Sequence, residues 1–130
     1  MSELVGKTIV GLRVGRGEEV LTFDHPDGTS TSYETDGDCC SETWFADITG
    51  VNVLLDHTVL SAESVEMDEV LDGRCRQESD IFYGEKLTTD KGIVDIVYRN
   101  SSNGFYGGDI YLYTGKLPDD MKPITDDWSA

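Results

Sequence analysis

The chain has 130 residues, a length typical of a single domain that buries about two-thirds of its unfolded surface. It carries 26 acidic against 10 basic side chains, a formal net charge of −16, which disfavours direct binding to nucleic acid or to anionic membranes and favours a basic partner. No apolar run approaches the roughly 20 residues that span a bilayer, and no secretory signal peptide is recognisable, so we expect a cytoplasmic protein.

The first part of the chain predicts three short strands. Residues 9–14 are apolar and partly alternating, residues 20–23 form a second apolar run, and the stretch TSTSYE (29–34) reads as a polar strand. The stretches GRGE and DHPDG between them supply turn chemistry. Together these segments predict a meander with one solvated face.

The stretch DGDCCSETWF predicts the start of a short helix over residues 42–49. Ser41 is a suitable N-cap, because its hydroxyl can accept a hydrogen bond from a free amide of the first turn. Trp44, Phe45 and Ile48 follow at helical spacing and would form one apolar stripe. We therefore expect a helix that is anchored on the sheet by its two aromatic side chains.

Strand-like patterning resumes over residues 54–73, and residues 92–113 predict a β-hairpin. Asn103-Gly104 provides the turn. Tyr111 and Tyr113 alternate with the apolar residues of the return strand and so lie on its opposite face. Apolar side chains alternate along both strands of this hairpin: Val94, Ile96, Tyr98, Ile110 and Leu112.

These elements predict a single α+β domain over residues 1–115. Its core would be a twisted antiparallel sheet of about six or seven strands, able to curl toward a half-barrel, with one short helix packed across it. Residues 116–130 contain two prolines and four aspartates and predict an extended acidic arm, with Trp128 as its docking point.

The adjacent Cys39 and Cys40 would lie at the N-terminus of the predicted helix, where a thiol pKa is lowered. With His57 and Asp38 they could form a Cys-His-Asp nucleophilic set. No sequence feature brings His57 to the cysteines, and cysteine often packs as a small buried hydrophobe, so an enzyme is the least favoured class. Zinc ligands usually come in C-x2-C-like pairs, a spacing absent here, so we expect no metal and no cofactor.

The stretch SSNGFYGG (101–108) has a structural and a functional interpretation. Two consecutive glycines after Phe105 and Tyr106 permit a bulge or the close approach of a ligand, which would present both rings at a loop tip. A hairpin whose turn requires Asn-Gly and whose aromatic rings cover the core explains the same pattern.

The stretches DGDCCSETWF and YRNSSNGFYGGDIYLY together resemble a family of small uncharacterised domains of bacteria and their phages. In that family, paired cysteines and a Ser-Glu dipeptide precede a short helix, and an SNG-aromatic-Tyr-Gly-Gly turn follows a strand. The similarity runs through residues 1–115. It implies a phage or prophage accessory protein and implies no reaction.

The acidic excess favours a non-enzymatic function: binding and inhibition of a cationic host protein by an acidic surface that takes the place of nucleic acid. The alternative is a protein that binds or sequesters a nucleotide-like or polar metabolite, and acidity can also serve solubility alone. Seven carboxylates and four aromatic side chains are the expected partner contacts: Glu18, Glu19, Asp24, Asp27, Glu66, Asp68, Glu69, Phe105, Tyr106, Tyr111 and Tyr113.

Overall fold

The computed structural model describes residues 1–37, 40–69, 72–103 and 107–130. In these residues the chain is mostly antiparallel β-structure with one short α-helix, so it is more β than the α+β class expected. The elements in chain order are η1 (Ser2–Leu4), β1 (Thr8–Ile9), β2 (Gly11–Gly15), β3 (Val20–Asp24), β4 (Ser30–Gly37), β5 (Glu42–Thr49), α1 (Val51–Leu54), β6 (His57–Glu66), β7 (Ser79–Thr89), β8 (Gly92–Ser102), β9 (Gly108–Leu112), β10 (Lys122–Pro123) and β11 (Trp128–Ser129).

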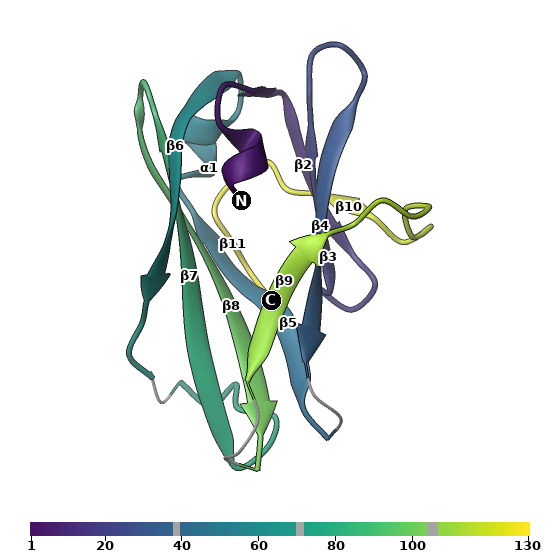
Figure 1. Cartoon of the computed structure of the whole chain (residues 1–130), viewed down its shortest axis with the longest axis vertical. Coiled ribbons are helices and arrows are strands. Elements are labelled where there is room, and N and C mark those ends of the chain that lie inside the picture. The colour runs from purple at the N-terminus through teal and green to yellow at the C-terminus, as the bar shows by residue number, and fades with distance from the viewer. Residues whose placement is uncertain (38–39, 70–71, 104–106) are drawn as a thin grey trace.

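Two sheets face each other across the hydrophobic core (Figure 1). The six-stranded sheet has the order β1-β6-β7-β8-β5-β11, and the five-stranded sheet has the order β10-β2-β3-β4-β9. The pairings within both sheets are antiparallel. We call the face that each sheet turns toward the other its inner face.

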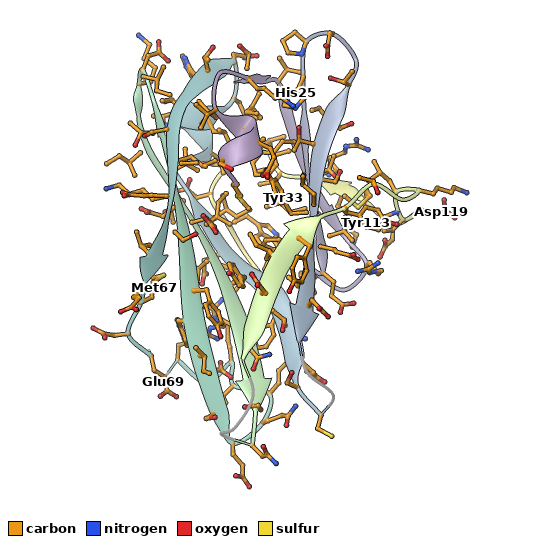
Figure 2. The ribbon with its side chains drawn as sticks, in the orientation of Figure 1. His25, Tyr33, Met67, Glu69, Tyr113 and Asp119 are labelled. Carbon is orange, nitrogen blue, oxygen red and sulfur yellow. The ribbon has the colours of Figure 1, made fainter. Side chains whose placement is uncertain are left out.

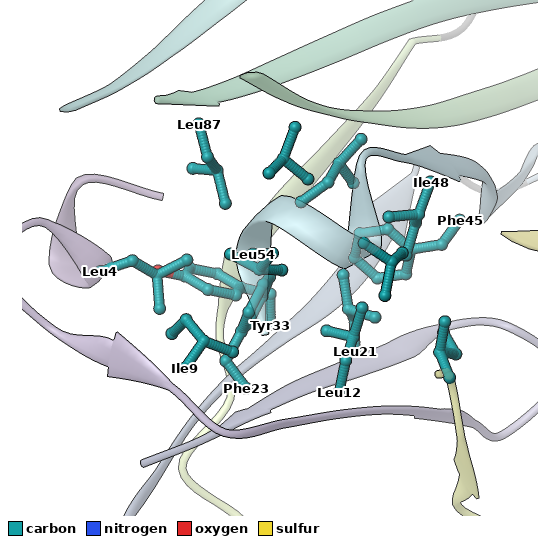
Figure 3. Packing of buried hydrophobic residues seen from close by; sticks show 14 of the residues in the cluster. Leu4, Ile9, Leu12, Leu21, Phe23, Tyr33, Phe45, Ile48, Leu54 and Leu87 are labelled. Atoms are coloured by element: carbon teal, nitrogen blue, oxygen red, sulfur yellow. The ribbon is translucent and has the colours of Figure 1, made fainter. Parts of the chain in front are cut away.

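Both inner faces supply large apolar side chains to the core (Figure 3). Leu12, Leu21 and Phe23 come from the five-stranded sheet, Phe45 and Ile96 come from the six-stranded sheet, and each is at most 1% exposed. Because burying one such side chain stabilises the fold by roughly 1.5–3 kcal/mol, this shared core holds the two sheets together.

The helix expected over residues 42–49 is wrong, because this segment is strand β5. Trp44 and Phe45 are buried on opposite faces of the strand, Phe45 in the core and Trp44 beneath the guanidinium of Arg76, 4.0 Å from the ring centroid. A β-bulge after Phe45 returns Ile48 to the core. The apolar spacing thus fits a strand buried on both faces, and aromatic and β-branched residues favour strands.

The hairpin expected over residues 92–113 is also wrong, because β8 and β9 belong to different sheets. Strand β8 is paired with β7 on one edge and with β5 on the other, which leaves no edge for β9. Its hairpin partner is β7, joined by a turn at residues 90–91. Tyr111 and Leu112 do lie on opposite faces of β9, and Gly104 of the expected turn lies outside the described residues.

The C-terminal segment adds one strand to each sheet. Strand β10 pairs with β2 in the five-stranded sheet, and β11 pairs with β5 in the six-stranded sheet. Trp128 packs against the core as predicted, and Ile124, which the sequence analysis did not single out, is buried in it at 4% exposed. This segment therefore links the two sheets along one side. The opposite side lies between β9 and β6, which the two-residue strand β1 covers only at its start (Figure 1).

A second buried layer covers the outer face of the six-stranded sheet. Arg99 is fully buried there, with its guanidinium 4.0 Å from the Phe82 ring centroid, and it lies opposite Trp44 in the β5–β8 pair. Its Nη2 donates to Asp72 at 2.7 Å, and its Nη1 lies 3.5 Å from Asp80. These contacts hold the segment after β6 onto β7 and β8, whose inner faces line the candidate site together with that of β6.

The Asp72 contacts predict how stability responds to acid. The Arg99 and Arg74 guanidinium groups hold the pKa of the Asp72 carboxyl well below its ordinary value of 3.8. A carboxyl with a depressed folded-state pKa contributes stability that is present above its unfolded pKa and is lost as the pH falls toward the folded value. We expect the free energy of unfolding to fall below about pH 4, and Asp72→Asn to flatten that fall in urea unfolding measured at several pH values.

Asp95→Asn serves as the matched control, because Asp95 is an exposed carboxyl and the same charge is removed. Its pH profile should run parallel to that of the wild-type protein. If the Asp72→Asn profile also runs parallel to wild type, the ion pairs of Asp72 do not stabilise the folded protein.

Candidate binding groove

A cavity of about 360 Å³ opens between the inner face of the six-stranded sheet and strand β9. We call it the groove. Figure 2 shows Tyr33, one of its lining residues, lying between the two sheets. The lining comes from both sheets and from the N-terminal segment: Met1, Glu3, Tyr33, Ser64, Glu85, Tyr98, Asp109, Ile110, Tyr111 and Leu112.

The residues that line the groove include three carboxylates from separate elements. Glu85 on β7 is only 5% exposed, accepts a hydrogen bond from the Ser64 hydroxyl at 2.8 Å, and has the Met1 ammonium 4.0 Å away. Glu3 accepts a 2.8 Å hydrogen bond from the Tyr33 hydroxyl, and Asp109 accepts one from a backbone N–H of β9. The groove lining thus contains three carboxylates and one ammonium.

Tyrosine hydroxyls in the groove stay protonated. Burial and the charges of Glu85 and Asp109 raise the pKa of Tyr98, and burial with the hydrogen bond to Glu3 raises the pKa of Tyr33. Backbone hydrogen bonding and the Tyr33 hydroxyl lower the pKa of Glu3, which keeps it ionised. The groove is therefore anionic and lined by neutral phenols, a combination that repels phosphate groups and favours a cation.

The floor of the groove is fixed by aromatic stacking. The rings of Tyr83 and Tyr98 stack with centroids 4.9 Å apart, and the ring of Tyr98 packs edge-on against Phe45 in the core. The Tyr83 hydroxyl accepts the Gly108 N–H at 3.0 Å, which ties the start of β9 to the six-stranded sheet. These contacts position the free part of β9 over a preformed cavity.

A smaller cavity of about 220 Å³ continues the groove along the outer face of β9 and shares Asp109 and Tyr111 with it. Asp36 lies directly opposite Asp109 in the β4–β9 pair, and both are exposed. Like charges placed opposite each other on a sheet are destabilising, so a cation bound beside this pair would relieve repulsion.

The glycine pair of the SSNGFYGG stretch has a structural role. A Cβ atom at Gly108 would lie 2.6 Å from the Thr43 hydroxyl, and one at Gly107 would lie 2.9 Å from the Tyr83 hydroxyl. The two glycines thus allow β9 to pack closely on the six-stranded sheet. Phe105 and Tyr106, the aromatic residues expected to bind a partner, lie outside the described residues.

The structure places the carboxylates chosen from the sequence in three separate regions. Glu18 and Glu19 lie at the β2–β3 turn, Asp24 and Asp27 lie at the end of β3 and in the β3–β4 turn, and residues 66–69 lie at the end of β6 and beyond it. Figure 2 shows Glu69 and His25, which precedes Asp27 by two residues, at opposite ends of the molecule. These carboxylates do not form one surface.

Some of these predicted contacts already have partners within the chain. Asp24 accepts two hydrogen bonds from the Arg13 guanidinium, at 2.9 and 2.7 Å. Asp27 accepts hydrogen bonds from the backbone N–H and hydroxyl of Thr29, which lower its pKa and order the turn. Glu66 is different, because it lies opposite Tyr83 in the β6–β7 pair and so faces the groove side.

The two described tyrosines of the predicted set have different surroundings. Tyr111 lines the groove and is 52% exposed. Tyr113 follows β9, donates its backbone N–H to the Ser32 carbonyl, and has the Arg16 guanidinium 5.7 Å from its ring centroid. Tyr113 is therefore held on the outer side of the five-stranded sheet, away from the groove.

Sequence analysis missed all three carboxylates of the groove lining, Glu3, Glu85 and Asp109. The sequence did contain a signal for Glu85. Every second residue of β7 lies on its inner face, and Glu85 stands between Tyr83 and Leu87 at such a position, where an apolar residue is expected. A charged residue at such a position is uncommon without a partner or a function. Glu3 lies in a short 3-10 helix, for which no periodic signal exists.

The nucleophilic set considered from the sequence is not assembled by the described residues. Cys39 and Asp38 lie outside them. Cys40 precedes β5 near one end of β8, whereas His57 lies 3.4 Å from Asp90 at the turn by its other end. An 11-residue strand separates the two sites by on the order of 30 Å.

Metal-ligand clusters and membrane-spanning helices are both absent from the described parts of the chain. In those parts, no group of three or more His, Cys, Asp or Glu side chains is arranged to hold a metal ion. No helix in the same residues has the length and apolar character needed to cross a membrane.

A family model described as Domain of unknown function (DUF7448) matches residues 2–112. The matched span contains strands β1 to β9 and the lining of the groove from Glu3 to Leu112. No curated protein and no solved structure matched the chain.

Proposed function

Because the chain belongs to the DUF7448 family of domains of unknown function, we propose its function from the groove itself: a non-enzymatic protein that binds a cationic segment of a partner protein. The observation that carries the proposal is that Glu3, Glu85 and Asp109, from three separate elements, all line one cavity. Partly desolvated carboxylates form stronger hydrogen bonds to ammonium or guanidinium groups than solvated ones do. The net charge of −16 would add long-range attraction of a basic partner.

A basic host protein is the partner that this charge favours. In this form of the proposal the chain is a phage-type accessory protein of the bacterial cytoplasm, and it inhibits a nucleic-acid-binding or defence protein by occupying a cationic site. Two features support this form of the proposal. The motifs of the chain resemble those of bacterial and phage domains, and the chain has 26 acidic against 10 basic residues. Duplex DNA should compete with the protein for such a partner.

A second candidate function is the binding of a small polar ligand in the groove. The cavity of about 360 Å³ falls within the usual range for small-molecule sites and is lined by tyrosines and convergent polar groups. The carboxylates favour a cationic metabolite over the nucleotide-like ligand considered from the sequence. Binding of a small ligand within the cavity should respond less to salt than binding of a basic protein surface.

The substitutions Glu3→Gln, Glu85→Gln and Asp109→Asn, made together, are expected to abolish retention of the partner. Each amide keeps the oxygen that accepts the existing hydrogen bond, so the triple variant should retain the fold. The measurement is a pull-down from host lysate by the immobilised protein at low and at moderate salt, with thermal unfolding of each variant run in parallel.

A second triple variant, Asp95→Asn, Asp119→Asn and Asp126→Asn, removes the same charge from exposed residues outside the groove. It should retain the partner at low salt. Equal loss of the partner by both variants would show that net charge alone, without the groove, accounts for binding.

A further inference from the structure

We propose that the cationic segment binds as an added β-strand along the free edge of β9. This inference rests on the proposed function and specifies the form of its ligand: an extended basic peptide segment rather than a folded basic surface. Strand β9 is the last strand of the five-stranded sheet, and among the described residues no strand is paired with its other edge.

The backbone of β9 is oriented for such pairing. Tyr111 lies opposite Glu34 in the antiparallel β4–β9 pair, and the Tyr113 N–H donates to a β4 carbonyl at 2.8 Å. Since residues of an antiparallel strand alternate between its two edges, Tyr111 and Tyr113 direct their N–H and C=O groups toward β4. Ile110 and Leu112 therefore direct theirs toward the groove side.

The Ile110 N–H on the free edge donates to a side chain of β9 itself, because no neighbouring strand accepts it among the described residues. The Asp109 carboxylate accepts the Ile110 N–H at 2.8 Å. This contact places a negative charge at the free edge, where an incoming basic segment would approach. A side-chain acceptor of this kind can be exchanged for a backbone carbonyl when a strand is added, which frees the carboxylate to bind a cation.

Charge is available on both faces of the site. Side chains of an added strand would point alternately into the groove and toward the outer face of the five-stranded sheet. Glu3 and Glu85 lie on the groove side, and Asp36 and Asp109 form the opposed pair on the outer side. A strand with Lys or Arg at alternate positions would therefore meet carboxylates on whichever face its cations take.

Glu85 gives an independent reason to expect a cation in the groove. It is 5% exposed, and its recorded polar contacts are one hydroxyl and an ammonium 4.0 Å away, a distance at the limit of an ion pair. A buried carboxylate with so little compensation is unfavourable until a cation approaches more closely. A lysine side chain entering from an added strand would supply that cation.

A second copy of this chain is a poorer occupant of the same edge. Pairing of two β9 strands would bring the Asp36 and Asp109 carboxylates of both copies together, in molecules that each carry a net charge of −16. Acidic residues on an edge strand are a common means of preventing such self-pairing.

The test uses two peptides with the same side chains. The first is acetyl-(Lys-Val)4-amide, and the second is the same peptide N-methylated at every residue, which removes the N–H groups along both edges. Wild-type protein should bind the first peptide at low salt, and the N-methylated peptide about tenfold more weakly or worse, because backbone hydrogen bonds to β9 are lost.

Leu112→Pro should weaken binding of the first peptide, because the free edge of β9 then lacks an N–H that would donate to a peptide carbonyl. Proline deletes the N–H that faces the free edge and leaves the hydrogen bonds between β9 and β4 in place, a position where edge strands tolerate it. Leu112→Val, which changes the side chain but keeps the N–H, is the matched control and should bind the first peptide more tightly than Leu112→Pro does.

Equal binding of both peptides by wild-type protein would overturn the added strand and leave the charge-based function standing. No binding of either peptide at low salt would contradict both the added strand and the proposed function. A protein that sediments as a dimer, with its β9 amides protected from exchange before peptide is added, would overturn the proposal in favour of self-pairing.

Discussion

Replacement of Arg99 by methionine is expected to destabilise the protein by about 3–5 kcal/mol. Arg99 is fully buried and interacts with Asp72 and Asp80, and Asp80 itself is 5% exposed. Methionine fills much of the same volume and removes the positive charge, so the Asp80 carboxylate would remain buried without its cation. Urea unfolding at neutral pH, followed by circular dichroism, measures the change.

The double variant Arg99→Met with Asp80→Asn separates the charge effect from packing. Because a buried ion pair is costly to break but often dispensable as a whole, the double variant should recover a large part of the lost stability. If the single variant loses less than about 1 kcal/mol, the buried pair does not carry the energy that we assign to it.

Trp44→Ala is expected to cost about 3–5 kcal/mol, the usual range for deleting a large buried aromatic side chain. Trp44 is 2% exposed and lies on the outer face of β5, covered by the Arg76 guanidinium. Its loss would open a cavity under the segment after β6 and detach the outer layer from the sheet. Denaturant unfolding of the variant gives the free energy directly.

Trp44→Phe is the matched control, because it keeps a ring at the same position and should lose much less stability. Trp44 lies opposite Arg99 in the β5–β8 pair, so the Trp44→Ala and Arg99→Met effects should not add. Additive effects would mean that the two side chains do not belong to one packed layer.

Local patterns in the sequence predicted several strands and the meander of β2, β3 and β4, but not the pairing of strands that are distant in the sequence. The apolar runs that became β2 and β3, and the alternation of Ile96 and Tyr98 toward the core, follow directly from period-two patterning. The pairing of β9 with β4 joins segments distant in sequence, and no local signal specifies it. The Asn-Gly turn signal therefore pointed to a hairpin that the two occupied edges of β8 exclude.

The misassigned helix has a similar cause. Trp44 and Phe45 are adjacent and both buried, which a strand allows only when both of its faces are covered. The cover on the outer face comes from residues about 30 positions later in the chain, including Arg76. Residues 42–49 alone do not show that later residues bury Trp44, so an amphipathic helix with one apolar face was the simpler interpretation.

The amino-acid composition shows that the protein is acidic, but it does not show which acidic residues form the candidate site. Asp24 was chosen because it is acidic, yet Arg13 neutralises it from the neighbouring strand. Glu85 was overlooked, although an acidic residue at a core-facing position was the more informative signal. Which carboxylates converge is decided by the facing of two sheets, which only the three-dimensional structure reveals.

The central claim is that the groove carboxylates contact the cation of the partner, and carboxyl carbon NMR shifts test it most directly. On titration with acetyl-(Lys-Val)4-amide at low salt, we predict saturable shifts of the Glu3, Glu85 and Asp109 carboxyl carbons with one common Kd, while those of Asp95 and Asp126 stay constant. Shifts of equal size at all exposed carboxyl groups, with no saturation at the groove, would contradict the account.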